Sequence, residues 1–190
     1  MKLMEDRVRR DAVIENGDVL KVGTFLNQTI DVPFIRECAD EFYRLFKDEH
    51  VTKVLTVEAS GIGLACLVAL PFGVPVLFAK KSRSSNIAGG VYTAPVFSFT
   101  HGTQHEIMVP CNMLGPGDRV LLVDDFLAKG EALHGMLELC KKAGATAVGA
   151  GIFVEKAYQG GGDEIRATGL RVESLAKIKS MSVENGLEFC

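Results

Sequence analysis

The sequence predicts an α/β fold with a mainly parallel sheet covered by helices on both faces. Short strand-like runs alternate with helical runs along most of the chain. The strand-like runs are apolar nearly throughout instead of alternating, which is typical of strands buried on both faces. A length of 190 residues, with 47% apolar and 24% charged side chains, is enough for one domain with a substantial core.

The alternation of strands and helices begins after residue 50. The expected elements, in chain order, are a strand over 53–58, a helix over 62–70, strands over 76–79 and 119–124, a helix over 131–143 and a strand over 146–154. Pro71 and Gly144 mark the ends of the two helices. This order predicts helices that connect parallel strands.

Two segments interrupt that order. Before it, helices are expected over 3–14 and 33–47, with an irregular or strand-like stretch over 19–27 between them. Residues 81–105 are polar and small at first and are expected to form a long loop, which in a compact domain is often functional. Its later part, 91–99, is compatible with a strand pair at a sheet edge, since Pro95 has no N–H to donate.

Charge and composition exclude several classes of protein. The formal net charge of −3 does not give the strongly basic surface of a protein that binds nucleic acid by charge alone. No apolar run reaches the ~20 residues of a membrane span, and acidic residues near the start replace the apolar stretch of a signal peptide. Five cysteines without a Cys-x-x-Cys pair predict buried free thiols in a reducing compartment. We therefore expect a cytoplasmic protein.

Charged residues follow three of the predicted strands abruptly, at Glu58, at Asp124-Asp125 and at Glu155-Lys156. In open α/β sheets, ligands bind beyond the carboxyl ends of the strands. The middle segment is the most informative, because a turn of small residues and the start of a helix follow its two carboxylates. Free N–H groups at a helix start bind phosphate, Gly130 permits close approach, and carboxylates accept hydrogen bonds from sugar hydroxyls. The pattern suggests a phosphorylated ribose, and an ordinary turn with solvated aspartates explains it about equally well.

The segment Asp124-Asp-Phe-Leu-Ala-Lys-Gly-Glu-Ala132 resembles the phosphoribosyl pyrophosphate (PRPP) motif of type I phosphoribosyltransferases. Further matching pieces, in order along nearly the whole chain, are Leu20-Lys-Val, Phe25-Leu-Asn27, Ser60-Gly-Ile62, Phe78-Ala-Lys80, Ser98-Phe-Thr100, Glu155-Lys156 and Arg171-Val-Glu-Ser-Leu-Ala176. Within the family, the chain most resembles the bacterial branch that acts on xanthine.

The resemblance implies the type I phosphoribosyltransferase fold as a single domain over 1–190. It implies a small hood formed by about 1–50 and the C-terminal segment, a core of about 51–155, a mobile active-site loop of about 81–105, and a homodimer. The implied reaction transfers the 5-phosphoribosyl group of PRPP to N9 of xanthine, giving xanthosine 5′-monophosphate and pyrophosphate. Mg²⁺ is expected to arrive with PRPP, and no protein side chain is assigned to it.

The resemblance also implies a role for each site residue. The roles are Asp124 and Asp125 at the ribose as catalytic residues; Ala128, Lys129, Gly130, Glu131 and Ala132 around the 5′-phosphate; Glu58, Ala59, Ser60, Gly61 and Lys80 at the pyrophosphate; and Leu20, Asn27 and Lys156 at xanthine.

One position departs from the wider family pattern. The hypoxanthine–guanine branch carries an aspartate, a candidate base, where this chain has Ala128. Xanthine is more acidic than other oxopurines, so an anionic substrate needs a base less. Glu131 is a nearby substitute, or simply an acid favoured in the first turn of a helix by the helix dipole.

Three alternatives stay open at this point. A PRPP-binding regulatory protein would keep the acidic motif, but Lys80 and Lys156 stand where a transferase needs them, and the first 50 residues resemble the hood and not a DNA-binding module. A transferase that prefers guanine or hypoxanthine would share most of the site. A nicotinamide-nucleotide domain is weakly indicated by Gly61-Ile-Gly63, because Cys66 replaces the third glycine. The triplet Gly160-Gly-Gly162 has no functional interpretation from the sequence.

Overall fold

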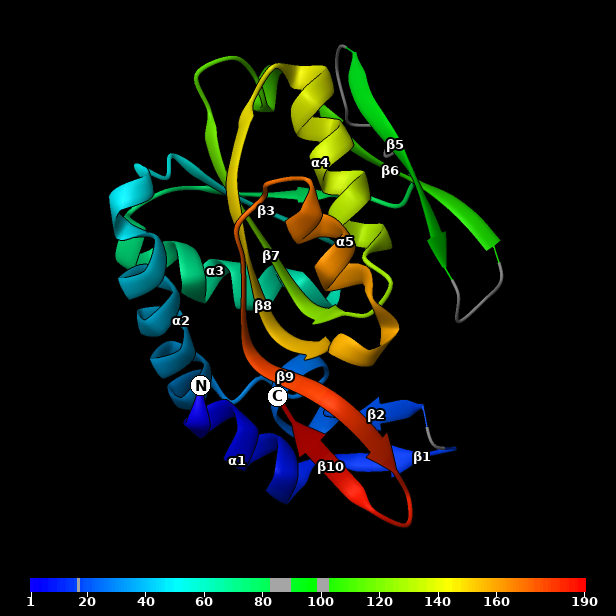
Figure 1. The fold of residues 1–190 in the computed structure, drawn as a ribbon. Coiled ribbons are helices and arrows are strands. Elements are labelled where there is room, and N and C mark those ends of the chain that lie inside the picture. Colours follow the sequence, from blue (N-terminus) through cyan, green and yellow to red (C-terminus); the bar gives the residue numbers. More distant parts are fainter. Residues whose placement is uncertain (17, 83–89, 99–102) are drawn as a thin grey trace.

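The computed structural model describes residues 1–16, 18–82, 90–98 and 103–190. Its centre is a six-stranded sheet in the order β10-β9-β8-β7-β3-β4, drawn in Figure 1. The strands are β3 (Lys53–Val57), β4 (Val76–Ala79), β7 (Arg119–Leu127), β8 (Thr146–Lys156), β9 (Val172–Ser182) and β10 (Gly186–Phe189). All neighbouring pairs are parallel except β10 with β9. The mainly parallel α/β sheet expected from the sequence is confirmed.

The order of the strands reverses between β3 and β7. From β3 the chain passes through α3 (Ser60–Phe72) to β4 on one side. From β7 it passes through α4 (Glu131–Ala143) to β8, and through α5 (Gly161–Ala167) to β9, on the other side. A crevice is expected where two such paths diverge, at the carboxyl ends of β3 and β7.

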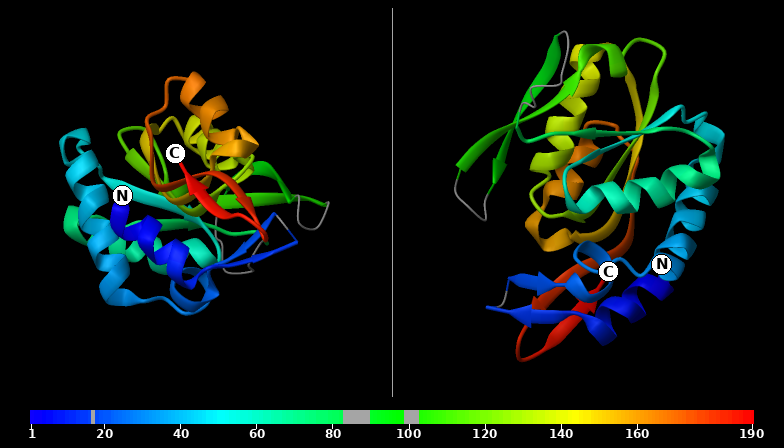
Figure 2. Two further views of the ribbon diagram at one scale, coloured as in Figure 1. Left: turned by 60° about the horizontal axis from the view of Figure 1, so that its bottom comes forward. Right: turned by 180° about the vertical axis from the view of Figure 1, so that it is seen from behind.

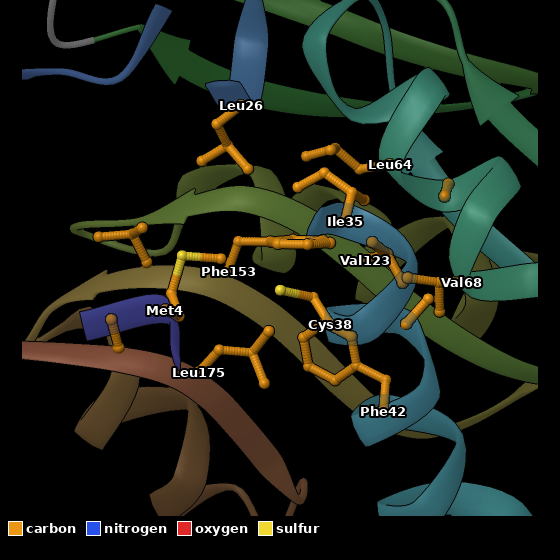
Figure 3. Close-up of a cluster of buried hydrophobic side chains, with 14 of the residues drawn as sticks. Met4, Leu26, Ile35, Cys38, Phe42, Leu64, Val68, Val123, Phe153 and Leu175 are labelled. Carbon is orange, nitrogen blue, oxygen red and sulfur yellow. The ribbon is translucent and has the colours of Figure 1, made fainter. Parts of the chain in front are cut away.

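Each face of the sheet has its own hydrophobic cluster. Successive residues of β7 point to opposite faces, so Val123 joins the cluster with α3 and α2 (Val32–Phe46), whereas Leu122 joins the cluster with α4 and α5. Figure 3 shows the first cluster, in which Phe42 of α2 and Phe153 of β8 meet edge to face, with ring centroids 5.3 Å apart. Helix α2, within the segment expected to contribute to the hood, thus packs on the sheet.

The hood lies beyond one end of the sheet. It contains α1 (Lys2–Asp11), the antiparallel strands β1 (Val13–Glu15) and β2 (Val19–Lys21), and a π-helix over Gly23–Asn27. Figures 1 and 2 show these blue segments beside the red β9–β10 hairpin, so both termini contribute to this part of the molecule. The helix predicted over 3–14 ends earlier, at Asp11, because the chain turns into β1.

A second hairpin projects from the other side. Strands β5 (Val91–Ser98) and β6 (Thr103–Pro110) pair antiparallel with each other. The hairpin packs closely on α4, because a Cβ at Gly135 of this helix would lie 2.5 Å from Cγ2 of Val96. Much of the loop expected over 81–105 is therefore strand. Residues 83–89 and 99–102 lie outside the described residues, so the predicted mobility there stays a prediction.

The cysteines only partly follow the sequence prediction. All five are free, and Cys38 and Cys140 are buried, where burial raises the pKa of each thiol to about 12. Cys66 and Cys190 are exposed, so the prediction of buried thiols was wrong for these two. Helix α3 is apolar around most of its circumference, and no polar stripe in the sequence marks Cys66 as facing away from the sheet. None of the helices in the described ranges is both long and apolar enough to span a membrane.

Candidate active site

The carboxyl ends of β3, β7 and β8 open into a cleft of about 790 Å³. The lining residues are Asp18 and Val19 of the hood, Val57, Glu58 and Ser60 at and after the end of β3, Lys81 after β4, the run from Asp124 to Leu133, Val96, Phe97, His105 and Ile107 of the β5–β6 hairpin, and Lys156 with Gln159. The cleft therefore lies where the reversal of strand order predicts a ligand, with the hood on one side and the hairpin on another.

The two aspartates of β7 form an acidic pair in the floor of the cleft. Each is 9% exposed, and both lie within the strand, which runs on to Leu127 instead of ending at Asp124 as predicted. The N–H of Asp125 donates to Oδ1 of Asp124 at 3.0 Å, and the amide of Asn27 donates to Oδ2 of Asp125 at 3.2 Å. The pair is thus fixed from its own strand and from the hood.

The negative charge of the acidic pair is only partly balanced by nearby positive charge. Burial, and then the neighbouring charge of Asp125, raise the pKa of the Asp124 carboxyl well above its ordinary value, and Lys81 opposes this only in part. Two close, mostly buried carboxylates favour any cationic group that comes between them. A positive charge that develops on a bound sugar would meet that demand.

Residues 128–132, here called the phosphate loop, join β7 to α4. Gly130 is the N-cap of α4 with a φ of +86°, a conformation that favours glycine. The first N–H groups of a helix have no partner within it and attract anions, and here the residues that carry them line the cleft. All five residues predicted around the phosphate line the cleft. Oε2 of Glu131 also accepts a hydrogen bond from the N–H of Phe97, at 3.4 Å.

Residues 58–61 connect β3 to α3 through a cis peptide bond between Glu58 and Ala59. Glu58 and Ser60 line the cleft, whereas Ala59 and Gly61 do not. A Cβ at Gly61 would lie 2.0 Å from Oγ1 of Thr56, so this glycine lets α3 pack closely on β3. Its role visible in the structure is packing, which the sequence pattern did not distinguish from ligand contact.

Two adjacent lysines follow β4, and they differ in placement. The backbone of Lys80 makes two hydrogen bonds of 2.9 Å with Met108, and its ammonium lies 6.0 Å from the ring centroid of Phe78. Lys81 lines the cleft and Lys80 does not, and the N–H of Lys81 donates to Oε1 of Glu58 at 2.6 Å. Neighbouring residues of an extended chain point to opposite sides, so the sequence alone could not choose between them.

Lys156, at the end of β8, meets the hood. Its ammonium donates to the backbone carbonyl of Asp18 at 2.5 Å. The carboxylate of Asp18 accepts from the hydroxyl of Tyr158 at 2.7 Å and from the amide of Gln159 at 3.0 Å. Burial lowers the pKa of Lys156, and the charge of Asp18 opposes that shift. No pattern in the sequence points to Asp18 or Gln159, because these partners are about 140 residues apart.

The remaining two residues expected at the base lie behind the lining. Leu20 is buried in the core cluster shared with α1 and α2, and Asn27 ends the π-helix, where it reaches Asp125. The sequence also missed Phe97 and His105, which line the cleft from β5 and β6. Only the tertiary placement of that hairpin brings them to the site.

The cleft suits a metal ion that arrives with a phosphorylated ligand. In the part of the chain that the structure describes, no three His, Cys, Asp or Glu side chains gather as a ligand set. The cleft does contain the carboxylates of Glu58, Asp124 and Asp125. Magnesium is often held by one or two carboxylates together with substrate phosphates and water, and this set of donors fits such a metal.

Comparison with known proteins gives a consistent picture. Residues 29–183 match the family model described as phosphoribosyl transferase domain. The xanthine phosphoribosyltransferase of Lachnoclostridium phytofermentans is 50% identical over 98% of this chain and 96% of its own, and that of Bifidobacterium longum subsp. infantis is 49% identical over 98% and 97%. The solved structure of adenine phosphoribosyl transferase from Trypanosoma brucei, in complex with AMP, pyrophosphate and ribose-5-phosphate, superimposes with a TM-score of 0.78. It is 19% identical and covers 96% of this chain and 83% of its own.

Proposed function

This chain belongs to the phosphoribosyltransferase family, and we propose that its substrates are xanthine and PRPP. The proposed reaction forms a bond from N9 of xanthine to the anomeric carbon and breaks the bond from that carbon to pyrophosphate. Counted from neutral xanthine, the products are xanthosine 5′-monophosphate, pyrophosphate and a proton. The observation that carries the proposal is one continuous strand, turn and helix start that brings the acidic pair and the phosphate loop into the same cleft.

The acidic pair has the properties that this chemistry needs. Displacement at an anomeric carbon passes through a transition state with oxocarbenium character. Asp124 and Asp125 are buried side by side, so a positive charge on the ribose is stabilised more there than in water. The phosphate loop holds the 5′-phosphate at a fixed distance from the pair, which orients the sugar.

Ser60 and Lys81 are proposed to hold the leaving pyrophosphate. Ser60 supplies a hydroxyl donor and Lys81 a cation at the same edge of the cleft. Bound Mg²⁺ would neutralise charge on the leaving group. The carboxylates that would help hold it are Asp124, Asp125 and Glu58.

Lys156 is proposed to recognise the base. Its ammonium is a donor for the exocyclic oxygen that xanthine has and adenine lacks. To reach the base, it must exchange its hydrogen bond to the carbonyl of Asp18 for one to the substrate. Asn27 lies beside the acidic pair, where an amide both donates and accepts, and Leu20 supports this side from the core.

No carboxylate stands at Ala128 to accept the proton from the base. Glu131 is directed to the N–H of Phe97, which ties its carboxylate to β5. Xanthine that enters as an anion has already lost the proton, and we propose this form as the substrate. We also propose the cytoplasm as the site of action and a homodimer as the assembly, as the family resemblance implies.

The test is direct synthesis of nucleotide. The protein is mixed with PRPP, Mg²⁺ and, separately, xanthine, guanine, hypoxanthine or adenine, and product is followed by chromatography. Xanthine is expected to give the highest kcat/KM. Absence of product from every base would overturn the transferase proposal, whereas a preference for guanine or hypoxanthine would overturn only the specificity.

A further inference from the structure

The glycine triplet 160–162, which the sequence analysis left without a function, begins α5 behind the phosphate loop. Gly160 turns the chain with a φ of +82°, and Gly161 and Gly162 are buried. Gly161 does not line the cleft, whereas residues 128–132 do. It therefore meets the phosphate loop from outside the cleft.

The approach of Gly161 to the loop is too close for any side chain. A Cβ at this position would lie 2.3 Å from the carbonyl carbon of Lys129, 2.5 Å from the oxygen of Ala128 and 2.6 Å from the nitrogen of Gly130. All three are backbone atoms of the phosphate loop, so no rotation of a side chain can relieve the clash. The N–H of Gly161 also donates to the oxygen of Ala128 at 3.2 Å.

Helix α5 is itself held firmly in place, so it cannot easily yield. Arg166 makes two hydrogen bonds, of 2.8 and 2.7 Å, to the carboxylate of Glu155 on β8, which is 1% exposed. Ser174 of β9 donates to the same carboxylate. Burial acts to raise the pKa of Glu155, but the hydrogen bonds from Arg166 and Ser174 outweigh it, and the pKa lies below its ordinary value. Glu155 is thus a charged anchor for α5.

The neighbouring glycine has a different environment. A Cβ at Gly162 would lie 2.2 Å from Oε1 of Glu155 and 2.7 Å from Nη1 of Arg166, which are side-chain atoms of the anchor. The two consecutive glycines therefore separate two effects. A side chain at 161 displaces the phosphate loop, and a side chain at 162 disturbs the ion pair that anchors α5.

We propose that Gly161 is a positioning residue for phosphate binding, which sets the phosphate loop from behind at the distance that its N–H groups need. This inference rests on the proposed function for the identity of the ligand. Because the loop binds through backbone groups, a displacement of a few tenths of an ångström weakens every hydrogen bond to the phosphate together. A methyl group at 161 should therefore lower affinity for PRPP and leave the base side unchanged.

The test compares three alanine variants of the full chain. Gly161→Ala is the test, Gly162→Ala disturbs the same helix without reaching the loop, and Gly115→Ala is the control, because nothing lies within 4 Å of its added Cβ. The dissociation constant of ribose 5-phosphate is measured by calorimetry, and KM for PRPP and for xanthine by steady-state kinetics. Circular dichroism and thermal melting check the fold.

For Gly161→Ala we expect at least a tenfold rise in the dissociation constant of ribose 5-phosphate and in KM for PRPP, with KM for xanthine within twofold. For Gly162→Ala we expect a lower Tm with ribose 5-phosphate affinity within twofold, and for Gly115→Ala no change. A folded Gly161→Ala protein with unchanged ribose 5-phosphate affinity would overturn the inference. So would a loss of the same size in Gly162→Ala.

A second variant covers the outcome in which Gly161→Ala does not fold. Cδ1 of Ile165 would lie 2.9 Å from a Cβ at Gly130, so it limits the loop from the same helix. Ile165→Val removes that atom alone and should weaken ribose 5-phosphate binding about threefold; unchanged binding would overturn the inference. Binding of ribose 5-phosphate by wild-type protein that makes no nucleotide would overturn the proposed function only, and the glycine comparison would still stand.

Discussion

The two ends of the cleft are built in different ways. The phosphate end is one short stretch of chain, residues 128–132, that presents backbone N–H groups at the start of a helix. The base end is assembled from side chains far apart in sequence, with Asp18 in the hood and Lys156 and Tyr158 after β8. Under the proposed function, phosphate recognition would therefore depend on local backbone geometry, whereas base recognition would depend on how the hood docks on the sheet.

The acidic pair lies between these two ends and belongs to both. Asp124 and Asp125 come from the strand that leads into the phosphate loop, yet Asn27 of the hood donates to Asp125. A substitution there should affect turnover more than binding of either ligand alone. The following predictions test whether the ends are separable, from the largest expected effect to the smallest.

The largest effect is expected from Asp125→Asn. Removal of this charge takes away stabilisation of the cationic ribose, and loss of one such electrostatic contact typically costs 10²–10³ in turnover. We expect kcat with PRPP and xanthine to fall by about 100-fold. The affinity for ribose 5-phosphate should change by a few-fold at most. Steady-state kinetics and calorimetry on the same preparation measure both; unchanged kcat would remove Asp125 from the catalytic machinery.

Lys156→Ala should act on the base end alone. Hydrogen bonds that involve a charged group contribute about 1.5–3 kcal/mol, so KM for xanthine is expected to rise by roughly 10- to 100-fold. Ribose 5-phosphate affinity should stay within twofold of wild type. Equal losses for the two ligands would mean that Lys156 has a structural role and that the ends are not separable.

A smaller effect is expected where the hood meets β8. Asp18→Ala removes the acceptor for Tyr158 and Gln159. Both bonds are exposed to solvent, so each is expected to contribute only about 0.5 kcal/mol, and KM for xanthine should rise about fivefold. Asp18→Asn keeps an oxygen acceptor and should stay near wild type. If KM for xanthine rises as much in Asp18→Asn as in Asp18→Ala, the charge of Asp18, and not the docking of the hood, determines binding of the base.

The smallest effect is a change of stability with pH. The pKa of Asp124 is raised in the folded protein above its value of about 3.9 in an unfolded chain, so folding favours the protonated form. Stability from this group is full below about pH 4 and is lost as pH rises through the raised pKa. Asp124→Asn cannot ionise, so its Tm should exceed that of wild type by about 2–4 °C at pH 7.5, an amount that corresponds to about 1 kcal/mol.

That gain should shrink towards pH 4, where the folded wild-type carboxyl is protonated and the unfolded one is about half protonated. Differential scanning fluorimetry across this range measures the two proteins side by side. A Tm difference that does not depend on pH would show that burial of the Asp124 charge does not limit stability.

The same contrast explains what the sequence could predict. The alternation of apolar strands and helices predicted the parallel sheet, which is confirmed, and the run from Asp124 to Ala132 suggested a phosphate site at a strand end, which stays a prediction; both are local patterns. Leu20 and Asn27 were identified only by resemblance to a family. The contacts of Asp18 with Lys156, Tyr158 and Gln159 could not be predicted, since they exist only once the hood has docked.

Glycines show the same limit. Gly130 was identified from its place before a helix, but the need for glycine at 61 and 161 comes from atoms of other segments, Thr56 in one case and the phosphate loop in the other. The choice of Lys81 over Lys80 at the cleft likewise depends on how the chain after β4 pairs with β6. A residue pattern without a structure carries no signal for such contacts.

The claim that the two ends are separable is tested most directly by calorimetric titration of ribose 5-phosphate into three proteins. The account predicts that Lys156→Ala binds it within twofold of wild type, while Gly161→Ala binds it at least tenfold more weakly. Equal weakening in both variants, or none in Gly161→Ala, would contradict the account.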